Sequence, residues 1–375
     1  MSPYISDKSK VHSSSADSTR RPPILASIGT VLIDAFECPV LAPKVKTLLC
    51  PSTTSQPAHI LSQDEIQSTD LAQSSDCSPA VAISSDASTP QVALSGGALY
   101  ALIGARMWLA SNELCTLVDR APRGTDVLPE LEEDLNQFGS GMWAWNEAEG
   151  TRMTRARIRY DGDIRMYQHV VKPPHRTVSC LLDTPLAGAE YLHIGPPFSP
   201  EDLAEFLAEL TQRADTEWRP RIPEPRGAPV LLLLSNVFSS EASLKLTIEK
   251  LVRHLIDDIG VGQHGDGVVV IRSGKLGACV ATRLGGLEWF PAYFSGQLEL
   301  RVMDVTGAGN AFLGGYVAGL VLSNADAYEA ALYATVSASF VVEQIGLPIF
   351  SPAPTELWNG DQPTHRLRDL RSRLS

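Results

Sequence analysis

Paired cysteines and long apolar runs are both missing from this 375-residue sequence. Its six cysteines are scattered, and no two of them form a C-x-x-C pair. Neither zinc-binding spacing nor a disulfide framework is visible, so reduced, mostly buried thiols are expected. No apolar run reaches the roughly 18 residues of a membrane-spanning helix, and the Ser-rich residues 1–21 lack the apolar core of a secretory signal. These absences predict a soluble, cytoplasmic protein.

Basic residues are also fewer than acidic ones. The chain has 31 Lys and Arg against 43 Asp and Glu, which gives a formal net charge of -12. Such a surface repels phosphate backbones and anionic lipids, so neither direct nucleic-acid binding nor a membrane partner is expected. A local cationic pocket for a small anion is still compatible with this balance. With 44% hydrophobic and 20% charged residues, the average composition is that of a globular protein.

Three segments depart from that average composition. Residues 1–22 form a polar tail that is predicted to be disordered, because it cannot bury enough apolar surface to offset its ordering entropy. Residues 51–90 contain ten serines and no Lys or Arg, which is typical of a surface insertion, and a variable spacer is favoured over a regulatory segment. Residues 356–375 are expected to be a C-terminal tail. The remaining residues, within 23–355, are enough for one α/β domain.

Short apolar runs alternate with helical patterns along that domain. Residues 23–34 are predicted to form a buried first strand, and residues 191–195 a second one. A helix is expected after the second strand, with Ser199 as its N-cap and Pro200 at its first position. The same unit is predicted for the strand 230–234 with the helix 240–258, which Gly260 would end, and for the strand 268–271. Continuous apolar strands separated by helices indicate a mostly parallel sheet that is covered on both faces.

Residues 152–172 have a different pattern, in which arginines alternate with apolar residues around a central Gly162. This alternation predicts a hairpin of two antiparallel strands that lies outside the main sheet. Its basic side chains are expected to form a solvated face.

The segment Asp304-Val-Thr-Gly-Ala-Gly-Asn310 carries the clearest chemical signal, because its glycines lead directly into an apolar helix. Gly307, Ala308 and Gly309 are small enough for backbone N–H groups to point outward at a helix N-terminus, where they favour an anion such as phosphate. Such a cradle can stabilise the charge of a phosphoryl group in transfer. Taken alone, the pattern would equally fit a tight turn before a packed helix.

Four segments, whose order along the chain is that of the family, resemble the PfkB or ribokinase-like family of sugar and nucleoside kinases. The segment 304–310 is similar to the C-terminal signature of that family, and the segment 272–277 to its nucleotide-site turn. The other two are the di-glycine segment Leu94-Ser-Gly-Gly-Ala-Leu-Tyr-Ala-Leu-Ile-Gly-Ala-Arg106 and the opening segment Ile28-Gly-Thr-Val-Leu-Ile-Asp34. Residues 289–293, 312–315 and 338–348 further resemble the fungal Mak32-like proteins within this family.

The resemblance implies a three-layer ribokinase-like α/β fold with a small antiparallel β lid, for which the hairpin 152–172 is the candidate. It also implies ATP- and Mg²⁺-dependent phosphoryl transfer to a hydroxyl of a small sugar-like or nucleoside-like molecule, by a monomer or homodimer. Gly307, Ala308 and Gly309 would form the catalytic anion hole, and Glu241 would help to hold the metal. Asp304 would contribute to a monovalent-cation site or to the phosphate-site backbone. The remaining implied positions are Arg272, Gly274, Gly277, Asp304 and Thr306 for the nucleotide, and Asp34, Gly96 and Gly97 for the acceptor.

The sequence departs from the family pattern at three places. Asn310 stands where the family has the aspartate that accepts the proton of the acceptor hydroxyl, and an amide cannot do so at neutral pH. A weakened kinase and a catalytically inactive binding or regulatory protein are both compatible with this change. Leu99 and Tyr100 replace polar family residues, so a scaffold recruited for non-phosphoryl chemistry is a third reading. Asn236 and Glu241 are five residues apart, where the family element has three.

None of the histidines shows metal-binding spacing. His169, His175 and His193 are therefore expected to be structural.

Overall fold

The computed structural model describes residues 21–36, 91–161, 164–195, 198–213, 218, 241–262, 264–352 and 354–375. The expected N-terminal tail and Ser-rich insertion lie almost wholly outside these residues, as do the strand expected at 230–234 and Asn236. In the described part of the chain, every helix is too short or too polar to span a bilayer.

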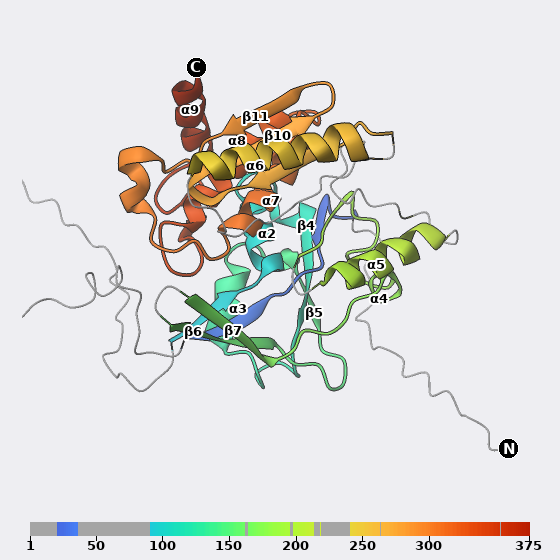
Figure 1. Ribbon diagram of the computed structural model, residues 1–375. Coiled ribbons are helices and arrows are strands. Elements are labelled where there is room, and N and C mark those ends of the chain that lie inside the picture. The colour runs from blue at the N-terminus through green and yellow to red at the C-terminus, as the bar shows by residue number, and fades with distance from the viewer. Residues whose placement is uncertain are drawn as a thin grey trace, which may run out of the picture.

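A four-stranded parallel sheet lies at the centre of the fold (Figure 1). Its strand order is β5-β4-β1-β8, and each neighbouring pair runs parallel. The expected parallel sheet is thereby confirmed. Since the carboxyl ends of parallel strands meet at one edge, residues 27, 119 and 193 end their strands on the same side of the molecule. The strands are β1 (Leu25–Ser27), β4 (Leu114–Asp119), β5 (Trp143–Asn146) and β8 (Tyr191–His193).

The opening segment 23–34 is not one strand, as the sequence predicts, but two. After β1, the chain leaves the parallel sheet at Gly29 and Thr30 and enters a second sheet with the order β3-β2-β6-β7. The apolar run continues through the break because both strands are buried, so hydrophobicity alone does not mark the boundary. The strands of this second sheet are β2 (Leu32–Phe36), β3 (Gln91–Ser95), β6 (Thr154–Asp161) and β7 (Ile164–Val171).

The hairpin expected at residues 152–172 is the pair β6–β7, which is antiparallel and lies outside the main sheet. Strand β2 connects it to the rest of the molecule, because β2 runs parallel to β6 and antiparallel to β3. The second sheet thus carries both the opening segment and the lid hairpin.

A third sheet contains β9 (Val268–Arg272), β10 (Ala278–Thr282) and β11 (Gly286–Phe290), all antiparallel to their neighbours. The strand-then-helix unit expected at β9 is therefore wrong, because a tight turn at 274–277 returns the chain as β10. Gly277 is required there: its φ is 87°, and a Cβ would stand 1.9 Å from the carbonyl oxygen of Phe290.

Two predicted helices are confirmed. Helix α5 (Pro200–Gln212) begins after Ser199, whose Oγ accepts a hydrogen bond from the Asp202 backbone N–H. Helix α6 (Glu241–Arg253) widens into a π-helical turn at His254–Ile259 and ends at Gly260, where φ is 77°. Shorter helices are α3 (Pro129–Asn136) and α4 (Val178–Leu182).

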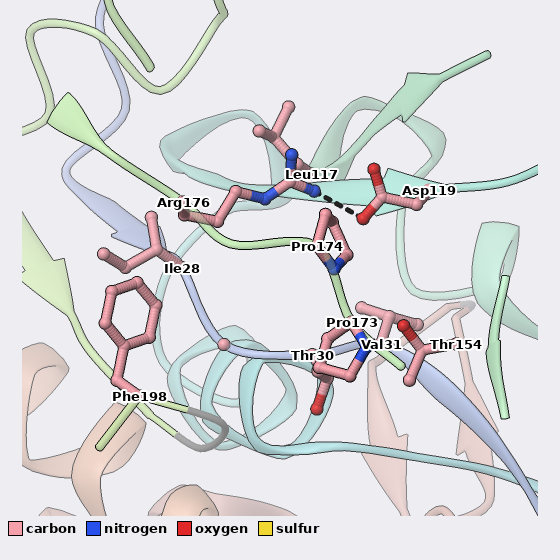
Figure 2. Close-up of a pocket in the computed structure, with 11 residues that line it drawn as sticks. Ile28, Thr30, Val31, Leu117, Asp119, Thr154, Pro173, Pro174, Arg176 and Phe198 are labelled. Atoms are coloured by element: carbon pink, nitrogen blue, oxygen red, sulfur yellow. Dashed lines mark hydrogen bonds and ion pairs between the residues drawn. The ribbon is translucent and has the colours of Figure 1, made fainter. Parts of the chain in front are cut away.

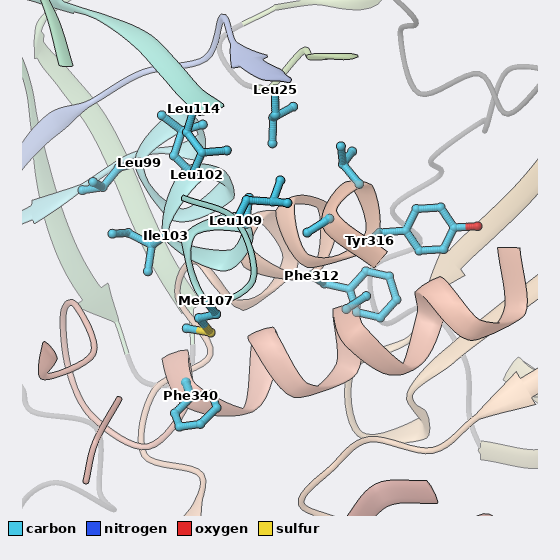
Figure 3. Close-up of a cluster of buried hydrophobic side chains, with 14 of the residues drawn as sticks. Leu25, Leu99, Leu102, Ile103, Met107, Leu109, Leu114, Phe312, Tyr316 and Phe340 are labelled. Carbon is cyan, nitrogen blue, oxygen red and sulfur yellow. The ribbon is translucent and has the colours of Figure 1, made fainter. Parts of the chain in front are cut away.

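Helices α2 (Gly97–Arg106), α7 (Ala308–Leu322) and α8 (Ala327–Val341) pack closely against one another. Glycine permits this approach, since a Cβ on Gly104 would stand 2.1 Å from the Ala311 carbonyl oxygen. Figure 3 shows the apolar side chains that these helices bury together, among them Leu102, Phe312 and Phe340. This core holds the N-termini of α2 and α7 in fixed positions.

Residues 356–375 are part of the domain rather than the tail that the sequence suggests. They contain β13 (Leu357–Trp358), which pairs with β12 (Phe350–Ser351), and helix α9 (Pro363–Leu374). The side chains of Leu367 and Leu370 join the main core. Apart from the buried stripe that contains Leu367 and Leu370, the helix is strongly polar. Its composition therefore resembles that of a solvent-exposed tail.

Candidate functional site

The segment 304–310 forms the start of helix α7. Gly307 is the N-cap residue with φ of 81°, so it has no side chain that could accept the first N–H groups of the helix. A carboxylate oxygen of Asp304 instead accepts the Thr306 N–H at 2.9 Å, which fixes the turn before the helix. Small residues at the cap leave backbone donors facing outward, as the sequence predicts for an anion hole.

Arg272, the last residue of β9, reaches this helix start. A Cβ built on Gly309 would stand 1.6 Å from its Nη1, so the guanidinium occupies the space in front of Gly309. Burial lowers the pKa of Arg272 to about 10, which leaves it protonated at neutral pH. Its Nε is buried and has no hydrogen-bond partner among the described residues. A cation with an unused donor beside a helix N-terminus is an arrangement that favours an anionic ligand.

His193, at the carboxyl end of β8, is a neighbour for which the sequence predicts only a structural role. Its side chain is only 4% exposed, and Nδ1 lies 2.7 Å from Ser27 Oγ. Burial and then the charge of Arg272 lower its pKa to about 4, whereas Asn310 favours the protonated form. Within the described chain, its buried Nε2 makes no hydrogen bond of ordinary geometry, so Asn310 approaches the ring without closing such a bond. His193, Arg272 and Asn310 thus meet beside the anion hole.

The di-glycine segment lies next to the same helix. Gly96 has φ of 123°, and a Cβ there would stand 2.2 Å from the Thr30 carbonyl oxygen, so only glycine fits this approach. Tyr100, one turn into α2, is buried, and its ring packs against Gly307. Its position therefore agrees with core packing. The two glycine motifs, some 200 residues apart in sequence, are joined through this contact.

Asp34 lies on β2 and is only 1% exposed. Its Cα is registered with Ala93 and Ala156 of the neighbouring strands. It does not line the pocket that opens at the carboxyl ends of β1 and β4. The structure thus places Asp34 in the second sheet, outside the set of residues that line the pocket, and Gly97 at the first position of α2.

The pocket itself is drawn in Figure 2. The connection between β1 and β2 forms one wall, and the segment Pro173–Arg176, which follows the lid hairpin, forms another. An ion pair between Arg176 and Asp119 crosses its edge, and Asn146 donates to the same carboxylate at 2.6 Å. The sequence reasoning missed this pair, although Asp119 ends a largely apolar strand. The lining residues are Ile28, Gly29, Thr30, Val31, Leu117, Asp119, Thr154, Pro173, Pro174, Arg176 and Phe198.

Glu241, the expected metal ligand, is the first residue of α6. Its carboxylate forms an ion pair with Lys275 of the turn at 274–277, and both side chains are more than half exposed. The described residues contain no group of three or more His, Cys, Asp or Glu side chains that could hold a metal ion. The assignment of Glu241 to a metal stays a prediction.

Comparison with known proteins places these features in context. Residues 181–354 match the family model described as pfkB family carbohydrate kinase. An uncharacterised protein of Schizosaccharomyces pombe is 26% identical over 314 residues, which cover 74% of this chain and 85% of that protein. Protein MAK32 of Saccharomyces cerevisiae is 29% identical over 119 residues, about 31% of each chain.

Two solved structures share the fold. Ribokinase from Giardia lamblia superposes with a TM-score of 0.55 at 14% identity, covering 95% of this chain and 100% of that chain. Ribokinase from Cryptococcus neoformans var. grubii serotype A, solved in complex with ADP, superposes with a TM-score of 0.52 at 16% identity, covering 94% and 100%. The three-layer α/β fold expected from the sequence is confirmed.

Proposed function

Because the chain belongs to the PfkB family of carbohydrate kinases, we propose that it transfers a phosphoryl group from ATP to a hydroxyl of a small sugar-like or nucleoside-like molecule. The observation that carries this proposal is the partly buried guanidinium of Arg272 against Gly309, at the start of α7. Helix donors and a fixed cation converge there, and a phosphoryl group in transfer carries its charge on the oxygens that they would face.

The chain's own groups fit the phosphates of a nucleotide. Arg272 Nε supplies a buried donor without a partner in the described residues, and the absence of a side chain at Gly309 lets the guanidinium lie against the start of α7. The turn at 274–277 ends the strand that carries Arg272, so a nucleotide along this turn would present its phosphates to α7. Glycine at 274 and 277 keeps that turn tight, both with positive φ.

The described residues offer less for a divalent ion. Magnesium in phosphoryl-transfer sites is held by one or two carboxylates together with substrate phosphates and water. Glu241 is the candidate ligand, and its carboxylate forms an ion pair with Lys275 in this structure. Bound Mg²⁺ would neutralise charge on the phosphates. We also propose that a monovalent cation binds near Asp304. The relation of the chain to the Mak32-like subgroup is part of the same proposal.

We place the acceptor in the pocket of Figure 2, where hydroxyls could contact Thr30, Thr154 and Asp119 while the remaining walls are mostly apolar. Asn310 would orient the reacting hydroxyl by hydrogen bonding. Since an amide does not take up the proton, the reaction is expected to be slower than in a relative with aspartate at this position, by about 10²–10⁴-fold where no other group takes over as the base.

The test is ADP formation from ATP and Mg²⁺ with a panel of sugars and nucleosides. Asn310→Asp should raise the rate on the preferred acceptor by at least tenfold, and Arg272→Ala should weaken ADP binding by about tenfold in calorimetry. Thermal unfolding confirms that each variant is folded. If neither the wild type nor Asn310→Asp forms ADP above background on any acceptor, the kinase proposal is wrong.

Asn310 also supports a second candidate, a PfkB-family protein that binds nucleotide without turnover and acts as a binding or regulatory protein. Tight ADP binding with no turnover in either form would support it, whereas turnover that Asn310→Ala abolishes would contradict it. Non-phosphoryl chemistry, the third reading from the sequence, has less support, because Leu99 and Tyr100 are buried in the core. Activity without ATP would be its signature.

A further inference from the structure

The sequence predicts a structural role for His193, but this residue lies where the phosphoryl transfer is proposed to occur. It lies at the carboxyl end of β8, beside Asn310 and Arg272, and its Nε2 is buried without an ordinary hydrogen bond to the described residues. On the basis of the proposed kinase function, we infer that His193 accepts the proton of the acceptor hydroxyl, while Asn310 holds that hydroxyl in place. The imidazole would thus replace the carboxylate that the chain lacks at position 310.

The inference depends on which ring nitrogen of His193 carries the proton. A neutral imidazole carries one N–H, and Nδ1 is engaged with Ser27 Oγ at 2.7 Å. If Nδ1 donates to Ser27, Nε2 is left with a lone pair. The charge of Arg272 disfavours a second proton on the ring, whereas the hydrogen bonding of Asn310 favours the protonated form. The inference requires the neutral Nδ1–H tautomer.

The basicity of His193 is consistent with its role as the proton acceptor. The pKa of His193 is lowered to about 4, largely by burial, so the ring is neutral at physiological pH. The reference pKa of an aspartate is about 3.9. The buried imidazole is thus about as basic as the carboxylate it would replace, and it is available in its unprotonated form.

The step balances with ATP as the phosphoryl donor. A lone pair of the acceptor oxygen forms a bond to the γ-phosphorus, and the bond from that phosphorus to the β–γ bridging oxygen breaks, with its electrons leaving on ADP. The hydroxyl proton moves to Nε2 of His193 and is later released to water. The protonated ring would stand beside Arg272, so it returns to the neutral form before the next cycle.

Gly195 packs against the edge of the ring that carries Nε2. A Cβ at this position would stand 2.8 Å from His193 Cε1 and 3.4 Å from Nε2. Any side chain at residue 195 would therefore cover the atom that must meet the hydroxyl. A Cβ this close to Cε1 would also displace the ring and its Ser27 contact, so Gly195→Ala reports on the position of the ring together with access to Nε2.

The decisive experiment compares His193→Gln in two backgrounds. Alone, His193→Gln should lower kcat by about 10²-fold while ADP affinity, measured by calorimetry, changes less than threefold. With Asn310→Asp also present, a carboxylate supplies the base, so the same His193→Gln change should cost less than fivefold. Gly195→Ala should lower kcat with ADP affinity unchanged, and His254→Gln, at an exposed histidine paired with Asp258, is the matched control.

Equal losses from His193→Gln in both backgrounds would overturn the inference and leave the kinase proposal standing. If neither the wild type nor any variant, Asn310→Asp included, forms ADP above background, the kinase proposal itself is wrong. A third readout needs neither turnover nor a variant: nitrogen chemical shifts of the imidazole in the wild-type protein should report the neutral Nδ1–H tautomer between pH 6 and 8. A neutral Nε2–H tautomer, or a protonated ring at pH 7, would overturn the inference.

Discussion

The guanidinium of Arg272 fills the space that a side chain at Gly309 would occupy, with Nη1 1.6 Å from the position of a Cβ. The need for glycine at position 309 is therefore steric, because this residue lies inside helix α7. At position 307 the need is twofold, since φ is positive and Tyr100 packs against the backbone. The two glycines of the motif are thus required for different reasons, one by a cation and the other by the turn.

Gly309→Ala tests the contact directly. The new methyl group would force the guanidinium away from α7, so ADP affinity should fall by about tenfold. The cost in stability should be modest, about 1–2 kcal/mol, because the atom displaced is the far end of a flexible side chain. Calorimetric titration with ADP and urea-induced unfolding measure the two effects.

The control is the double variant Gly309→Ala with Arg272→Ala. Once the guanidinium is removed, the methyl has nothing to displace, so the two substitutions should be clearly non-additive in ADP affinity. Additive losses would mean that Arg272 does not contact Gly309 in solution.

The motif at 304–310 was predictable from sequence because its signal is local: glycines before an apolar helix imply exposed N–H donors. The meeting of Arg272, His193 and Asn310 was not, since it depends on how two different sheets and helix α7 come together in space. Helix α5 was predictable from its Ser199 cap for the same local reason. The break after β1 was not, because the residues on both sides of it are equally apolar and buried.

The free energy of unfolding should depend on pH through His193. Its pKa is lowered from 6.5 to about 4 in the folded protein, so the unfolded chain takes up a proton in this window and the folded one does not. The contribution is complete above pH 6.5 and is lost as pH falls toward 4. The slope approaches about 1.4 kcal/mol per pH unit, and the total loss is about 3 kcal/mol.

Urea unfolding of the wild type and of His193→Gln between pH 4 and 7 measures this contribution. The variant should be less stable at pH 7 but should lose less of its stability on acidification, so the two curves converge at low pH. Parallel curves would mean that the ring titrates normally in the folded state.

Arg366 should be essential for the packing of α9. It is 2% exposed, and its guanidinium pairs with Glu343 at 2.7 Å and with Asp361 at 3.1 Å. Arg366→Met would leave the nearly buried Glu343 with Arg301 as its remaining ion-pair partner in the described chain. Removal of one member of a buried ion pair costs about 3–5 kcal/mol, which urea unfolding would detect as a lower midpoint.

Arg368→Met is the matched control, because Arg368 lies on the same helix but is exposed. Its effect should stay within about 0.5 kcal/mol. If Arg366→Met also changed the free energy of unfolding by no more than about 0.5 kcal/mol, α9 would not be important for stability, as expected of a C-terminal tail.

Asp119 is expected to control the acceptor pocket through Arg176. The two side chains are 9% and 14% exposed, and their ion pair ties the segment after the lid to the end of β4. Asp119→Asn keeps an oxygen that can accept from Asn146 but removes the charge that holds Arg176. The freed guanidinium can then enter the pocket of Figure 2, so the KM for the acceptor should rise several-fold more than the KM for ATP.

Arg123→Gln is the control for loss of a charge pair in the same region. Arg123 pairs with Glu132, but its side chain is 75% exposed, and exposed pairs contribute about 0–1 kcal/mol. It should leave both KM values and the unfolding midpoint nearly unchanged. If Asp119→Asn behaves in the same way, the acceptor does not bind at this pocket. A rise in the KM for ATP alone would instead place the nucleotide there, because the substrate whose KM responds is the one that the freed guanidinium meets.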